Sequence, residues 1–158
     1  MAKTGQRGGA GGFGGWLRRL FGRRPPLPEH LRTGQWGEEV AVRHLRRKGY
    51  ELLGRNVRFG ARRELDAVMR EKATDTLVFV EVRTRRDETA GRPVESIRAA
   101  KRRVIGRAAW RYLTELRKKP AHFRFDVVEV VGLPGDGKPV VRHLENVFGL
   151  PEGMQVPW

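Results

Sequence analysis

The sequence predicts a mixed α/β domain with a central sheet of about five strands, in the order helix, three strands, helix, two strands. Two observations support this fold class. Between residues 50 and 144, short segments carry β-branched or aromatic residues in period-two alternation, which is typical of strands. Two longer segments, 34–48 and 94–118, repeat apolar residues at helical spacing. With 158 residues, the chain is long enough for one domain with a substantial core.

The charge balance points to a polyanionic partner. Lys and Arg number 33 against 18 Asp and Glu, a net charge of +15, which favours nucleic acid first and an anionic membrane surface second. The absence of cysteine excludes disulfides and thiolate zinc sites. No apolar segment approaches the roughly 20 residues that span a bilayer, and no secretory signal is recognisable. We therefore expect a cytoplasmic protein that is not an integral membrane protein.

Composition divides the chain into three parts. Residues 1–32 are predicted to be a disordered, basic tail, because residues 1–28 contain no Asp or Glu and glycine is frequent among the first 15. Within it, residues 16–21 could form an amphipathic turn that contacts nucleic acid, lipid or a partner protein. Residues 33–148 are predicted to be the folded domain, and residues 149–158 a C-terminal tail.

The first helix is predicted over residues 34–48. Trp36, Val40 and His44 lie on one apolar stripe, and Gly49 suits the position after the last turn. Glu38 and Glu39 would occupy the first turn, where the helix dipole favours acids, and this capping role is their simplest interpretation. Residues 50–58 follow as the first strand.

Residues 63–69 and 76–85 are predicted to form a hairpin about a polar turn at residues 71–75. If the chain folds about the bond between residues 73 and 74, one face of the hairpin is wholly apolar. A shift of one residue would move carboxylates onto that face, so the register is well specified. The apolar pairs would be Met69–Val78, Ala67–Val80 and Leu65–Val82; the opposite face would pair Val68–Phe79, Asp66–Glu81 and Glu64–Arg83.

The pair Asp66–Glu81 is unusual, because like charges directly opposite each other destabilise a ladder. Two carboxylates on rigid strands are what a Mg²⁺ site requires, since Mg²⁺ takes one or two carboxylates together with water and phosphate oxygens. The alternative is that Arg63 and Arg83 neutralise a solvated polar face. Spacing alone leaves both interpretations open.

A long helix is predicted over residues 94–118, with Pro93 suited to its start. Its apolar stripe would consist of Ile97, Ala100, Val104, Ala108, Tyr112 and Leu116, and its other side carries Arg98, Arg102, Arg103, Arg107, Arg111 and Arg117. Few acids are interleaved, so phosphate contact is favoured over a merely solvated face. Strands over residues 123–131 and 140–144 complete the sheet, with Arg124 and Asp126 predicted to form a surface salt bridge.

Several short motifs occur in the order seen in a widespread bacterial family, the uncharacterised YraN-like or UPF0102 family, which the chain resembles over about residues 33–148. That family is similar to the PD-(D/E)XK restriction-endonuclease-like superfamily and to archaeal Holliday-junction resolvases. Each motif is weak alone, and their order and spacing carry the resemblance. The motifs are Gly34-x-x-Gly37-Glu38, Gly49-Tyr50, Asn56, Glu64-Leu65-Asp66, Phe79-Val80-Glu81-Val82-Arg83-Thr84-Arg85, Gly91-x-Pro93, Lys101 and Arg124-Phe125-Asp126-Val127-Val128.

This resemblance implies a three-layer core and a set of site residues. Asp66 and Glu81 would bind Mg²⁺ or Mn²⁺, Val82 would contribute its backbone carbonyl, and Glu38 would complete the acidic cluster. Glu39 keeps its capping role. The implied catalytic residues are thus Asp66, Glu81, Glu38 and the residue at position 83.

Position 83 departs from the superfamily pattern, because Arg83 stands where a lysine is expected. A buried lysine can lose its proton, whereas arginine in a protein does not. Arg83 could stabilise charge on the attacked phosphate, or it could simply pair with Glu64 without catalysis. Lys101 and Lys72 are candidates for a displaced lysine.

Two functions remain in prospect: a metal-dependent endonuclease acting on branched or otherwise structured DNA, and a non-catalytic nucleic-acid-binding module on the same fold. Membrane attachment through residues 16–21 is a third, weaker alternative. Resolvase-like proteins often pair two sites across a junction, so a homodimer is compatible with the resemblance. The residues expected to contact nucleic acid are Arg85, Arg98, Lys101, Arg102, Arg103 and Arg107.

Overall fold

The computed structural model of the chain describes residues 27–60, 64–88, 97–156 and 158. Its elements are α2 (Glu29–Arg47), β1 (Tyr50–Arg58), β2 (Glu64–Glu71), β3 (Thr76–Arg85), α3 (Ala99–Glu115), β4 (Phe123–Val131) and β5 (Val140–Phe148). The five strands form one sheet in the order β1-β2-β3-β4-β5, in which β3 and β4 are parallel and the other neighbours antiparallel. The predicted α/β layout is confirmed.

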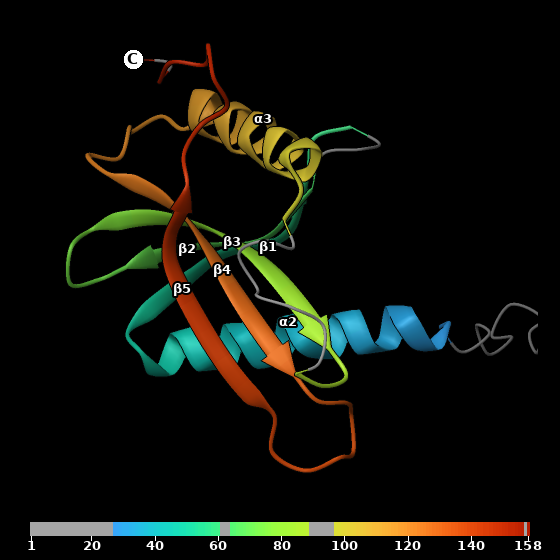
Figure 1. The fold of residues 1–158 in the computed structure, drawn as a ribbon. Helices are drawn as coiled ribbons and strands as arrows, with labels where there is room; N and C mark the ends of the chain where they lie inside the picture. Colours follow the sequence, from blue (N-terminus) through green and yellow to red (C-terminus); the bar gives the residue numbers. More distant parts are fainter. Residues whose placement is uncertain (1–26, 61–63, 89–96, 157) are drawn as a thin grey trace, which may run out of the picture.

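The two helices lie on opposite faces of the sheet (Figure 1). Successive side chains of a strand point to opposite faces, so the sheet has a core on each side. Val78 and Val80 pack with α2, whereas Phe79 between them packs with α3. The α3 helix is the crossover that the parallel pair of β3 and β4 requires. Neither described helix has the length and hydrophobicity that crossing a bilayer requires.

The α2 helix begins at Glu29, directly after Pro28, and so starts five residues before its predicted first residue. Glu38 and Glu39 therefore lie in the helix interior, and their predicted capping role is wrong: the acid in the first turn is Glu29. The prediction took Gly34 as the first residue, but the helix passes through this glycine. The end was predicted correctly, because Gly49 follows the helix with a φ of 92°.

The α3 helix is shorter than predicted, running from Ala99 to Glu115. Residues 89–96, including Pro93, lie outside the described part of the chain, as do residues 1–26 of the predicted tail. Ala100 is exposed, which corrects its place in the predicted apolar stripe. The residues that α3 buries are Ile105, Gly106, Ala108, Ala109 and Leu113.

The C-terminal residues lie against α3 and the start of β4, after a β5 strand that extends four residues beyond its prediction (Figure 1). The indole N–H of Trp110 donates to the carbonyl of Gln155 at 3.0 Å. The ring of Trp158 contacts that of Phe123 edge to face, with 6.5 Å between centroids. These residues pack on the domain although the sequence predicted only a tail.

The hairpin register is confirmed from Glu71–Thr76 to Ala67–Val80. The regular ladder ends there, because the side chain of Asp66 accepts the backbone N–H of Val82. Leu65 packs in the α3-side core, whereas Ala67 packs in the α2-side core, so the predicted place of Leu65 on the same face is wrong. On the neighbouring strand, Asn56 has a φ of 48°, although β1 stays paired with β2 on both sides of this residue.

Candidate active site

Asp66 and Glu81 lie side by side where β2 and β3 part. A backbone N–H fixes Asp66: the amide of Val82 donates to its Oδ2 at 2.8 Å. The two carboxyls are close enough for the charge of Asp66 to raise the pKa of Glu81. The Glu81 side chain is only 3% exposed. Glu81 therefore occupies a water-poor position beside Asp66, although the regular ladder ends before the predicted Asp66–Glu81 pair.

Burial and mutual repulsion raise the pKa of both carboxyls. Desolvation, followed by the charge of Asp66, raises the pKa of Glu81 to about 7. Desolvation also raises the pKa of Asp66, and the Val82 N–H and Lys101 oppose this effect. Such shifts are frequent at functional sites, because a site that binds a cation or moves a proton leaves its acids without permanent neutralisation.

Glu38 projects from α2 toward the same acids. Desolvation and then the charge of Asp66 raise its pKa, while a hydrogen bond from the Asn56 side chain and the charge of Arg55 lower it. One oxygen of Glu38 and one of Glu81, the Oε2 atom in each case, is buried without a hydrogen-bond partner in the described chain. Buried polar atoms without partners are rare in native proteins and require an explanation.

A cation from the opposite face of the sheet completes this cluster. Lys101, in the first turn of α3, places its Nζ 3.2 Å from Oε1 of Glu81. The guanidinium of Arg83 is more distant from the same oxygen, at 3.8 Å, and is 36% exposed. Lys72 belongs to the turn at the other end of the hairpin. Of the two candidates for a displaced lysine, Lys101 is therefore the one that reaches the acids.

The donor set suits a hard divalent cation only in part. Within the described residues, no three His, Cys, Asp or Glu side chains come close enough to hold a metal ion together. Asp66 and Glu81 nevertheless provide two carboxylates, and Mg²⁺ commonly completes its shell with water and substrate phosphate. Glu38 does not lie close enough to Asp66 and Glu81 to bind the same metal ion as a third ligand. The part of Val82 that contacts an acid is its N–H, although its carbonyl was the expected ligand.

The cations expected to contact nucleic acid fall into two groups. Arg98, Arg103 and Arg107 are exposed. Arg85 is 12% exposed and pairs with the buried Glu129 at 3.1 Å, so it is held within the fold. The guanidinium of Arg102 donates to the carbonyl of residue 97 and lies over the ring of residue 148.

The sequence interpretation missed a second buried polar cluster. Arg124 and Asp126 do form the predicted salt bridge, at 3.0 Å, but Asp126 is 0% exposed, so its predicted place on the surface is wrong. Asp126 also contacts Nε2 of His143 at 2.8 Å and accepts the N–H of Asn146 at 3.0 Å. A charged residue inside an apolar strand that pairs in parallel was the available signal, because such strands are usually covered on both faces.

The family described as "Uncharacterised protein family UPF0102" matches residues 37–130. A UPF0102 protein of Syntrophotalea carbinolica is 47% identical over 120 residues, which cover 76% of this chain and 94% of that protein. A UPF0102 protein of Symbiobacterium thermophilum is 43% identical over 117 residues, covering 74% and 96%. One of Nocardia farcinica is 43% identical over 117 residues, covering 73% and 87%. The chain belongs to the UPF0102 family.

Proposed function

We propose that this protein is a metal-dependent endonuclease that hydrolyses phosphodiester bonds of DNA, with branched or otherwise structured DNA as the preferred substrate. The observation that carries the proposal is the contact of Lys101 with Glu81 beside Asp66, in a cluster that leaves buried carboxylate oxygens without partners. Two acids on adjacent strands, with a lysine next to them, are also the arrangement that the PD-(D/E)XK resemblance implies. The net charge of +15 suits a nucleic-acid substrate.

Asp66 and Glu81 are the residues that would hold Mg²⁺ or Mn²⁺, and a bound ion would lower the pKa of water and offset phosphate charge. The chain prepares this position in two ways. The N–H of Val82 orients Asp66, and the ammonium of Lys101 holds one oxygen of Glu81, so the other oxygen keeps a defined direction. Glu38 adds negative charge at the α2 side of the cluster.

Lys101 performs the role of the lysine that the PD-(D/E)XK resemblance leads us to expect at position 83. Its ammonium carries three donors and can bond a phosphate oxygen while it remains next to Glu81. Arg83, whose guanidinium is more distant from Glu81 than the ammonium of Lys101, then contributes positive charge toward the attacked phosphate.

The alternative is a binding protein that has lost catalysis. The observation in its favour is the arginine at position 83. A protein that only binds phosphate gains little from the buried acids, however, because carboxylates repel the phosphate that must approach them. The nuclease is therefore the stronger proposal.

The test is cleavage of labelled duplex, single-stranded and four-way-junction DNA with Mg²⁺, with Mn²⁺ and with EDTA. We expect cutting that needs metal and that Asp66→Asn lowers by at least about 100-fold, while binding in EDTA persists. Lys101→Met should reduce cutting more than Arg83→Met does. Tight, salt-sensitive binding without cutting on any substrate would support the binding module and contradict the nuclease.

A further inference from the structure

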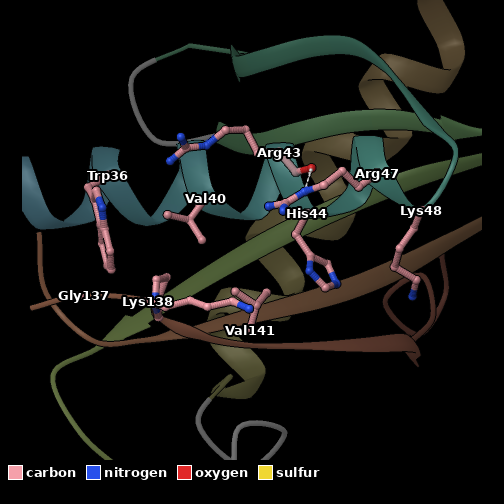
Figure 2. A pocket seen from close by; sticks show the side chains of 10 residues that line it. Trp36, Val40, Arg43, His44, Arg47, Lys48, Gly137, Lys138 and Val141 are labelled. Atoms are coloured by element: carbon pink, nitrogen blue, oxygen red, sulfur yellow. Dashed lines mark hydrogen bonds between the residues drawn. The ribbon is translucent and has the colours of Figure 1, made fainter.

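A cationic groove of about 630 Å³ runs between α2 and the β4–β5 hairpin. Figure 2 shows Trp36, His44 and Lys48 extending from α2 toward β5, with Lys138 reaching along the groove from the other side. Arg43 and Arg47 add two further charges along α2. Among the described residues, no acidic side chain lines this groove, which we call the α2–β5 groove.

These charges are largely uncompensated. Arg43, Arg47 and Lys138 are exposed, and none of them forms an ion pair with a described residue. Among the arginines of α3, Arg111 pairs with Glu115, and the hollow lined by Arg103 and Arg107 also contains an acid, at position 152. The α2–β5 groove therefore offers positive charge to an external anion.

One cation of the groove, Lys48, is held in place by a contact with His143. The Nζ of Lys48 lies 2.8 Å from Nδ1 of His143, and an ammonium can only donate, so Nδ1 accepts and the ring proton is on Nε2. Nε2 then donates to the buried Asp126 at 2.8 Å. Lys48 is also 3.7 Å from Glu145, at the rim. A chain of buried polar groups thus holds the ammonium at one end of the groove.

The groove lies on the other side of α2 from the acids. At 3.6 residues per turn, Glu38 is roughly 160° around the helix from Val40, which faces the groove. Consistent with a positive local field, burial and then the charges of Lys48 and Arg47 lower the pKa of His44. A strand that occupied both positions would have to pass around the helix.

We propose that the α2–β5 groove binds the phosphate backbone of the nucleic-acid strand that flanks the one cut at Asp66 and Glu81. This inference rests on the proposed function in one respect: that the bound strand is the one next to a cleaved strand. The binding it describes needs neither metal nor cleavage. Four cationic side chains can each contact a phosphate oxygen, and the indole of Trp36 provides an apolar wall next to them.

The test is the affinity of a fluorescently labelled single-stranded oligonucleotide in EDTA, measured over a range of salt concentrations. The double variant Arg43→Gln with Lys138→Gln should bind about tenfold more weakly, and its log affinity should fall less steeply with log salt, by about 1.4 in slope, because two phosphate contacts are lost. The matched control is Arg32→Gln with Arg46→Gln, which removes the same charge from exposed α2 positions outside the groove lining.

Equal weakening by the two double variants would overturn the proposal, since only overall charge would then matter. Loss of binding to phosphatidylserine vesicles with unchanged oligonucleotide binding would also overturn it, in favour of lipid head groups. Cutting, which Asp66→Asn should lower, and binding in EDTA, which the groove variants should weaken, are measured separately, so the two proposals can fail independently. If no form of the protein cuts DNA but the groove variants lose binding, the nuclease is wrong and the groove stands. If the groove variants bind normally and metal-dependent cutting is intact, the groove proposal is wrong and the nuclease stands.

Discussion

The sheet contains two clusters of buried acids, and they differ in how far their charges are satisfied. Around Asp126, both carboxylate oxygens contact Arg124, and His143 and the Asn146 N–H bind one each. Around Asp66 and Glu81, a carboxylate oxygen of Glu81 has no partner within the described residues. In the first cluster, the chain itself provides hydrogen-bond partners for both carboxylate oxygens. In the second, one carboxylate oxygen remains available to a ligand from outside the described chain.

Glu71, which accepts a hydrogen bond from Arg124 at 2.7 Å, and Glu81 have pKa shifts of opposite direction. Hydrogen bonds from Arg124 and then Thr74 lower the pKa of Glu71 to about 2, so this acid is stabilised as a carboxylate. Burial and the charge of Asp66 raise the pKa of Glu81 to about 7. Burial alone therefore does not identify a functional acid; the useful criterion is whether neighbouring donors compensate the buried charge.

The largest expected effect is a difference in the free energy of unfolding between substitutions in the two clusters. Asp126→Ala should lower the free energy of unfolding by about 3–5 kcal/mol, because it removes the fully buried carboxylate that Arg124, His143 and the Asn146 N–H all contact. Asp66→Asn should change it by less than about 1 kcal/mol, since the amide oxygen can still accept the Val82 N–H. Urea unfolding of both variants measures the difference. Equal costs would show that the two clusters serve the same structural purpose.

A smaller effect should appear in the pH dependence of stability. Because the folded-state pKa of Glu81 is raised to about 7, the folded protein retains a proton that the unfolded chain loses near 4.5. The stability contribution of Glu81 is thus complete below about 4.5 and declines by up to about 3 kcal/mol as pH rises to about 7. Glu81→Gln should become increasingly more stable than wild type over that interval, as urea unfolding at several pH values can show. A difference that does not vary with pH would contradict the raised pKa.

The smallest expected effect concerns the first of the two clusters. The hydroxyl of Tyr50 donates to Glu71 at 3.0 Å and accepts from Arg124 at 2.6 Å, so Tyr50→Phe should cost about 1 kcal/mol. The control is Tyr112→Phe, because the Tyr112 ring packs on Phe79 while its hydroxyl forms no hydrogen bond to a described residue. Chemical denaturation of both variants provides the comparison, and an equal cost would indicate that the cluster adds no stability through this hydroxyl.

Local patterns predicted the strands well. Residues 50–58, 76–85 and 123–131 have the predicted bounds, and the hairpin register follows from the period of two. The bounds of the helices were predicted less well: α2 begins five residues before Gly34, and α3 ends at Glu115, three residues before its predicted end. The apolar stripe of α3 was also displaced, since a helix rich in Ala and Arg offers several stripes of similar hydrophobicity.

The sequence by itself determined the strand pairing, the meeting of Asp66 with Glu81 and the cationic character of the chain, because these depend on alternation, turn position and composition. Only the tertiary structure decided which cations approach which acids. Lys101 reaches Glu81 because α3 crosses the sheet between two parallel strands, and Asp126 is buried because β5 covers it with His143. Contacts between residues distant in the chain depend on how helices pack on the sheet, and residue spacing carries no record of that packing.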